Sequence, residues 1–317
     1  MEMKISDMMQ GAKKVAIFGH VKPDGDCIGS TVGLYNYIVD NYPEVVVKVY
    51  LEKFADCFSI IHGVDKVEEY CQEDEEFDTV FVMDASTADR IGAGGLKMVE
   101  KCDRSFNIDH HVSNPGNICK VNYIVADASS AAEVLYYMLD ADKVSKNCAE
   151  ALYMGIVHDT GVFKFSATHK STLLAAADMV DKGVDFPRII NDTYFSRTYK
   201  QMVVTGKVMM DAKVILDGKV IYGYVTREMM NEYGVTSLEM DGIIDAIREV
   251  EGTEVAIFMY ALKGGYKVSL RSKYIVDVNK VAAEFGGGGH VRAAGCFGYG
   301  EPEKIVEKLA ELIKEQL

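Results

Sequence analysis

Short β-branched or aromatic runs alternate with helical patterns through the first half of the chain, and this alternation limits the fold more than any other feature. The strand-like runs are KKVAIFGH, VVVKVYLE, DTVFVMD and SFNIDHH, at residues 13–20, 45–52, 78–84 and 105–111. Between the first two, apolar residues recur at helical spacing, as at Ile28, Val32 and Tyr35. Such alternation predicts a parallel sheet with helices on both faces, in which ligands bind beyond the carboxyl ends of the strands.

The rest of the sequence indicates two domains, for which 317 residues are enough. We place a first α/β domain at residues 1–187 and a helical linker at 188–211. Residues 212–317 read as strand, strand, helix, strand, strand, helix, glycine loop, strand and helix. This order predicts a second, smaller domain of mixed α/β topology.

Polar residues follow the first strand-like run. His20 ends this run, Asp24 and Asp26 come directly after it, and Pro23 and Gly25 shape the turn between them. Taken alone, Asp26 could simply cap a helix that begins at the next residue. Acidic side chains that lie close together repel each other, however, unless a cation or a proton separates them.

Five further polar residues stand at the ends of later elements. Asp84 closes one strand-like run, Asp109, His110 and His111 close another, and Asp159 follows an apolar helix. Taken alone, Asp84 could bind the backbone of the next turn, and Asp159 could be an ordinary turn residue. Because the predicted fold gathers such ends along one edge, we expect the eight side chains to lie together there, with two divalent cations that relieve the repulsion among the carboxylates.

The types of ligand favour hard divalent cations. Carboxylates with a few histidines suit Mn²⁺ best, while Mg²⁺, Co²⁺ and Fe²⁺ are also compatible. Two such ions about 3.5–4 Å apart can share a water molecule, lower its pKa and direct hydroxide at phosphorus. The predicted reaction is therefore hydrolysis of a phosphoester.

A glycine-rich segment in the second domain, EFGGGGHVRAAGCFGYG at 284–300, predicts a phosphate site. Four successive glycines would leave backbone N–H groups free to point at an anion, with no Cβ to hinder its approach. Residues 263–292 hold six lysines and arginines against two acids, in a chain whose net charge is −14. The candidates for substrate contact are Arg90, Arg271, Gly286, Gly287, Gly288, Gly289 and His290.

In five stretches the chain resembles the DHH phosphoesterases, whose name is spelled by Asp109, His110 and His111. HVKPDGDCIGS, VFVMD, IDHH and GIVHDTGVF look like the four ordered motifs of the catalytic domain. GGGGHVRAAG looks like the signature of the DHH-associated C-terminal domain. The resemblance covers nearly the whole chain and implies a metal-binding catalytic domain followed by a substrate-binding domain.

The resemblance also implies a role for each polar residue. The implied ligands are His20, Asp24 and Asp84 for one metal, and Asp26, Asp84, His110 and Asp159 for the other. His111 would contact the scissile phosphate and stabilise charge or help to protonate the leaving group, while Asp109 would orient the histidines. Arg271 and the 286–290 loop would hold a substrate phosphate or base across an interdomain cleft.

Within the family, the length and the five motifs resemble the stand-alone nanoRNase and pAp-phosphatase group. The expected substrates are oligoribonucleotides of a few residues or pAp, cleaved to 5′-mononucleotides. Three alternatives stay open: a phosphodiesterase for cyclic-di-AMP or pApA, a pAp monoesterase with little nuclease activity, and a non-enzymatic nucleotide sensor. A sensor would be expected to lack a metal ligand, and here every matching position is filled.

Charge and composition restrict the partners. A net charge of −14 argues against coating of long nucleic acid, so we expect short RNA oligonucleotides or small nucleotides. Seven cysteines without a C-x-x-C pair favour reduced thiols. The N-terminal segment shows no apolar signal core, and no run of about 18 apolar residues occurs. We therefore expect a cytoplasmic protein without membrane contact, for which a homodimer is allowed.

Overall fold

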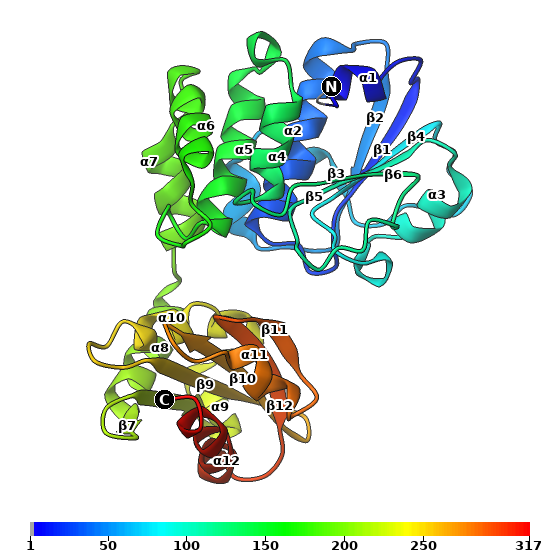
Figure 1. The fold of residues 1–317 in the computed structure, drawn as a ribbon. Helices are drawn as coiled ribbons and strands as arrows, with labels where there is room; N and C mark the ends of the chain where they lie inside the picture. Colours follow the sequence, from blue (N-terminus) through cyan, green and yellow to red (C-terminus); the bar gives the residue numbers. More distant parts are fainter. Residues whose placement is uncertain (1–2) are drawn as a thin grey trace. The chain divides into compact units, whose positions relative to one another are not determined.

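A computed structural model describes residues 3–317, except for the side chain of His290 (Figure 1). The chain forms two compact units, which divide between Ser196 and Arg197. This division falls inside the predicted linker, and the domain limits at 187 and 212 stay predictions.

The first unit contains a six-stranded parallel sheet with the order β3-β2-β1-β4-β5-β6. The strands are β1 Lys14–Phe18, β2 Val46–Tyr50, β3 Val67–Glu68, β4 Thr79–Met83, β5 Ser105–Asp109 and β6 Val121–Ile124. The chain leaves β1 toward β2 on one side and returns to β4 on the other. The topological switch point, where ligands bind in such sheets, therefore lies between β1 and β4.

Helices cover both faces of this sheet, as predicted from the alternating sequence. The helices are α1 Ile5–Met8, α2 Gly25–Asn41, α3 Gly95–Lys101, α4 Ala131–Met138, α5 Lys146–Asp159, α6 Lys170–Asp181 and α7 Phe186–Ile189. Along β1, Val15 and Ile17 face the core under α2, α4 and α5, whereas Ala16 and Phe18 face the core under α3 (Figure 1). Side chains alternate between the two faces of a strand, so one apolar run serves both cores.

The second unit contains a mixed sheet with the order β11-β12-β10-β9-β8-β7, in which only the β8–β9 pair is parallel. The strands are β7 Lys213–Ile215, β8 Val220–Val225, β9 Val255–Leu262, β10 Gly265–Ser272, β11 Gly288–His290 and β12 Ala293–Gly298. The helices are α8 Tyr199–Asp211, α9 Arg227–Tyr233, α10 Ile243–Arg248, α11 Val278–Ala283 and α12 Pro302–Lys314. Thus the predicted mixed topology is confirmed, with α10 and β11 added.

The segment predicted as a helical linker is not one continuous helix. After α7, a π-helical turn at Ile190–Phe195 ends the first unit. Thr198 then caps α8, because its hydroxyl accepts a hydrogen bond from the Gln201 N–H and its own N–H donates to the Gln201 side chain. Buried Val204 and Val208 pack α8 into the second unit. Among the helices that the structure describes, none is long and apolar enough to cross a membrane.

Candidate metal centre

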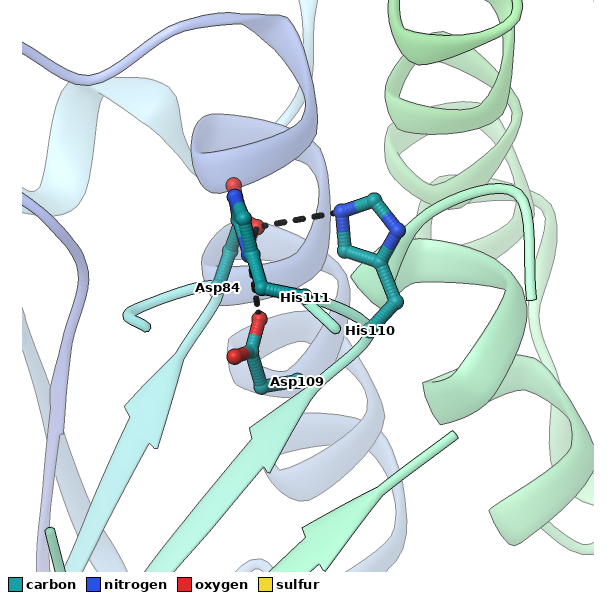
Figure 2. Close-up of side chains that lie close together, drawn as sticks. All are labelled: Asp84, Asp109, His110 and His111. Atoms are coloured by element: carbon teal, nitrogen blue, oxygen red, sulfur yellow. Dashed lines mark hydrogen bonds and ion pairs between the residues drawn. The ribbon is translucent and has the colours of Figure 1, made fainter. Parts of the chain in front are cut away.

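The carboxyl ends of β1, β4 and β5 bring the predicted polar residues of the first unit together. His20 follows β1. Asp84 follows β4, and Asp109 ends β5 just before His110 and His111 (Figure 2). Asp24 and Asp26 come from the start of α2, and Asp159 ends α5. All eight therefore lie around the switch point between β1 and β4.

Asp84 lies at the middle of this cluster. Its Oδ2 is 3.4 Å from Nε2 of His20, and its Oδ1 is 3.6 Å from both Nε2 of His110 and Nδ1 of His111. The side chain is only 3% exposed, and Oδ1 has no hydrogen-bond donor in the part of the chain that the structure describes. A buried carboxylate oxygen without a donor is costly, so this atom is suited to a cation.

Two histidines turn the same nitrogen toward the carboxylates. Nδ1 of His20 lies 2.9 Å from the Val21 carbonyl, and Nδ1 of His110 lies 3.3 Å from the Ala128 carbonyl. Because a carbonyl can only accept, Nδ1 carries the proton when each ring is neutral, and Nε2 is then the nitrogen available to a metal. Nε2 of His110 lies 3.3 Å from Asp159 and 3.9 Å from Asp26, whereas Nε2 of His20 lies 3.6 Å from Asp24.

Asp26 is held by a helix other than its own. Its carboxylate accepts hydrogen bonds from the N–H groups of Ala131 (2.6 Å) and Ala132 (2.9 Å), at the start of α4. The alternative that Asp26 caps α2 is wrong, because α2 begins at Gly25 and Asp24 accepts from the first free N–H groups. A Cβ at Gly155 of α5 would lie 2.8 Å from the Asp26 carboxylate, so the close approach of α5 requires glycine.

The start of α4 and Gly155 are contributions that sequence reasoning missed. Ser130 caps α4 by accepting from the Glu133 N–H at 3.0 Å, and the buried Glu133 accepts from Ser129 and Thr172. The stretch SSAAE at 129–133 carries the signal of a helix start, S-x-x-E. This sequence stretch gave no sign that the first N–H groups of α4 bind the Asp26 carboxylate.

The pKa shifts show how strongly these charges depend on one another. Burial, with repulsion from Asp84 and Asp159, raises the pKa of Asp26 well above its usual value. Burial also raises the pKa of Asp159 to about 7, although His110 attracts its charge. Burial opposes protonation of His20, but hydrogen bonds to Asp24 and Asp84 raise its pKa to about 10. The positive charges of the neighbouring side chains are therefore too few to balance the negative charges of the carboxylates.

The ligand atoms lie close enough for cations. Those of Asp26, His110 and Asp159 lie within 4.8 Å of one another, as do those of Asp84, Asp109, His110 and His111. Carboxylate oxygens and imidazole nitrogens are typical ligands of divalent metals. Oδ1 of Asp84, which has no hydrogen-bond donor among the described residues, faces these ligand atoms. A further group joins Cys27 to His20 and Asp84, and the Cys27 sulfur accepts from the His20 N–H at 3.3 Å. The centre fits divalent metal ions.

Strained backbone surrounds the ligands. Asp84 has φ +54°, Lys22 between His20 and Asp24 has φ +56°, and Val162 and Phe163 just after Asp159 have φ +58° and +62°. Residues other than glycine adopt such angles only where the surrounding structure demands it. The turns that carry the ligands are therefore fixed by the fold rather than by local preference.

The matches to known families decide where this chain belongs. Residues 14–156 match the DHH family, N-terminal domain, and residues 217–317 match the DHHA1 domain. The chain belongs to the DHH family. This membership confirms the resemblance seen in the motifs.

Similar proteins match nearly the full chain. The probable bifunctional oligoribonuclease and PAP phosphatase NrnA of Streptococcus mutans is 29% identical over 309 residues, which are 95% of each chain. The bifunctional oligoribonuclease and PAP phosphatase NrnA of Thermus thermophilus is 28% identical over 309 residues, 96% of this chain and 90% of that one. The structure of an exopolyphosphatase-related protein from Bacteroides fragilis has a TM-score of 0.90 and 26% identity, covering 98% and 94%.

Arg90 and Arg271 are the two arginines that the sequence predicts to contact substrate. The guanidinium of Arg90 lies 3.4 Å from Nδ1 of His20, at the edge of the metal centre. Arg271 lies on β10 opposite Ala293 of β12, which in turn lies opposite His290 of β11. The next row on the same face of the sheet lies two residues further along each strand and consists of Ser269, Gly295 and Gly288. Small residues therefore flank Arg271 on that face.

The expectation that the glycine amides are free is wrong for three of the four. The N–H groups of Gly286 and Gly287 donate to Ala283 and Ala282 at 2.9 Å, and that of Gly289 donates to Asn279 at 2.8 Å. The last carbonyls of α11 need partners, and Gly286 supplies one in a left-handed conformation with φ +69°. Gly288 of β11 pairs with Gly295 of β12, and the side chain of His290 lies outside the described residues.

Proposed function

We propose that this protein is a metal-dependent phosphoesterase that hydrolyses oligoribonucleotides of a few residues and pAp, releasing 5′-mononucleotides. The observation that carries this proposal is the Asp84 carboxylate, buried between two sets of ligands with one oxygen lacking a donor among the described residues. Two relatives whose printed names state both activities each match nearly the whole chain, which supports the choice of substrates.

We propose two divalent cations at the centre, with Mn²⁺ preferred. His20, Asp24 and Asp84 would hold one, and the second would be held by the set Asp26, Asp84, His110 and Asp159. When bound, such cations supply Lewis-acid activation of water and of the phosphoryl group. The chain's own part is to hold Nε2 of His20 and His110 toward the centre and to fix Asp26 at the start of α4.

We propose that His111 contacts the reacting phosphate. Its Nδ1 lies 2.7 Å from Oδ1 of Asp109, a fully buried carboxylate (Figure 2). A proton held between these atoms leaves Nε2 as the nitrogen that would meet the phosphate or the leaving oxygen. Arg90, next to His20, is proposed to bind a phosphate oxygen.

For the second unit, we propose that Arg271 binds a substrate phosphate on the face that it shares with Ser269, Gly288 and Gly295. Burial lowers the pKa of Arg271, and its guanidinium donates to the neighbouring Leu270 carbonyl at 3.1 Å. An arginine remains charged despite such burial, and its fork of N–H groups suits phosphate. Gly288, in the row beside Arg271, would let the backbone approach the substrate, whereas the amides of Gly286 and Gly287 serve α11.

A substrate panel tests the proposal. The compounds are pAp, pApA, cyclic-di-AMP and RNA of two to twenty-four nucleotides, compared by kcat/KM with Mn²⁺, and an Asp84→Asn preparation made in the same way controls for contaminating nucleases. We expect the highest values for pAp and RNA of a few nucleotides. A preference for cyclic-di-AMP would select the alternative, which is supported by a cyclic-di-AMP phosphodiesterase of Listeria monocytogenes that is 24% identical over 309 residues, 45% of its own length. A preference for the longest RNA would contradict both.

We also propose a reducing, cytoplasmic location and allow a homodimer. None of the seven cysteines forms a disulfide in the part of the chain that the structure describes, which agrees with a reducing compartment. Light scattering at several concentrations tests the homodimer, and a mass of about twice 35.0 kDa is the expected result for one. A single-chain mass throughout would exclude it.

A further inference from the structure

We propose that Asn114 is a positioning residue, which fixes the carboxylate of Asp109 and through it the imidazole of His111. The inference rests on the proposed function only in assuming that His111 meets the substrate. Its structural part concerns the orientation of a side chain and can be measured without any substrate.

Asn114 lies in the turn that follows β5, and its amide faces three acceptors. Nδ2 lies 2.7 Å from Oδ2 of Asp109, 2.8 Å from Oδ1 of Asn107 and 3.2 Å from the Ala85 carbonyl. On its other side, Oδ1 of Asn114 accepts from the Gly116 N–H at 2.9 Å. Rotating the amide by half a turn would place its oxygen against the carboxylate, so only one orientation is compatible with these partners.

Asn107 connects this amide to the neighbouring strand. It is fully buried on β5, and its Nδ2 lies 3.3 Å from the Val82 carbonyl and 3.4 Å from the Ala85 carbonyl. Both carbonyls lie beside Asp84, at the end of β4. The end of β4 therefore carries the shared carboxylate and also anchors the chain of amides that leads to Asp109 and His111.

Both oxygens of Asp109 are used by this arrangement. Oδ1 faces Nδ1 of His111 at 2.7 Å, and Oδ2 accepts from Asn114 at 2.7 Å, while the residue is 0% exposed. Without Asn114, Oδ2 of the buried Asp109 would lose this donor. The carboxylate would then turn to find another donor, which would disturb the hydrogen bond that fixes the His111 ring.

The test compares Asn114→Ala with Asn122→Ala. Asn122 of β6 also fixes a turn: its Oδ1 accepts from the N–H groups of Ile118 and Cys119, and its Nδ2 donates to the Cys119 carbonyl. These bonds do not involve Asp109, so this variant controls for a general loss of turn structure. Asn114→Asp is a second variant, which keeps the shape but removes the donor.

Three quantities are measured for each variant: metal content, the proton NMR signal of the His111 Nδ1–H in the Mg²⁺-loaded protein, and kcat with KM for a dinucleotide. Loss of the signal in His111→Gln identifies it. For Asn114→Ala and Asn114→Asp we expect the signal to shift or broaden, and kcat to fall about 10–100-fold with metal content and KM little changed. Asn122→Ala should keep both the signal and kcat.

An unchanged signal in folded Asn114→Ala would overturn the inference, and so would an equal shift in Asn122→Ala. Loss of metal from Asn114→Ala would also overturn it, since the residue would then act on the ligands rather than on His111. Failure of the wild type to cleave any short nucleotide would refute the proposed function instead, and the NMR result would still decide the role of Asn114.

Discussion

Asp84 and Glu254 are both buried carboxylates, but their surroundings differ in kind. Glu254 of the second unit accepts hydrogen bonds from the backbone N–H groups of Tyr274, Ile275 and Val276, at 2.6–3.2 Å. Asp84 of the first unit faces histidines, and its Oδ1 lacks a donor among the described residues. The exposed fractions of the two side chains are nearly equal, 5% for Glu254 and 3% for Asp84. Satisfaction of the hydrogen bonds, rather than burial, distinguishes a structural carboxylate from one that awaits a cation.

Asp84→Asn is the most severe test of this comparison. We expect kcat/KM to fall by at least about 1000-fold, because both sets of ligands lose their shared carboxylate. In metal-free buffer the melting temperature should not fall, since the change removes one of several carboxylates that repel each other. Activity in Mn²⁺ buffer and thermal unfolding by circular dichroism measure the two effects. Full activity in the variant would break the comparison.

Arg271→Ala tests whether the second unit contacts substrate. Loss of a hydrogen bond from a charged group costs about 1.5–3 kcal/mol, so KM for pAp should rise about 10–100-fold. Metal content should stay the same. Arg292→Ala is the matched control, because its guanidinium donates to the carbonyls of Val276 and Tyr274 and should affect stability instead. An unchanged KM would remove Arg271 from the substrate site.

Glu254→Gln tests the other side of the comparison. The amide nitrogen of glutamine would face backbone N–H groups, so we expect the free energy of unfolding to fall by about 1–3 kcal/mol. Metal content and KM should not change in the folded protein. Urea unfolding and metal analysis measure these. Loss of metal from the folded variant would mean that Glu254 is not purely structural.

Gly286→Ala should have the smallest effect. An added Cβ meets open space, but the left-handed backbone at φ +69° disfavours alanine by about 1 kcal/mol. Because the Gly286 N–H already serves α11, KM for pAp should stay within about 2-fold of the wild type. A much larger rise in KM would show that this part of the segment contacts substrate.

The sequence predicted what depends on local pattern. The parallel sheet followed from its alternating runs, and the convergence of Asp84 with His110 followed from the rule that strand ends meet at one edge. The partners of Asp26 could not be predicted, because Ala131 lies 105 residues away and contributes only a backbone N–H. The glycine amides were misjudged for a similar reason. Four glycines signal backbone freedom, but the end of α11 determines which partners their N–H groups find.

Metal analysis combined with chelation tests the central claim most directly. The protein is treated exhaustively with a chelator, titrated with Mn²⁺ and assayed on a dinucleotide at each step, in parallel with Asp84→Asn. The account predicts no turnover after chelation and recovery that is complete at two Mn²⁺ per chain, with neither stoichiometry nor activity restored in Asp84→Asn. Full catalysis by the chelated wild-type protein would contradict it.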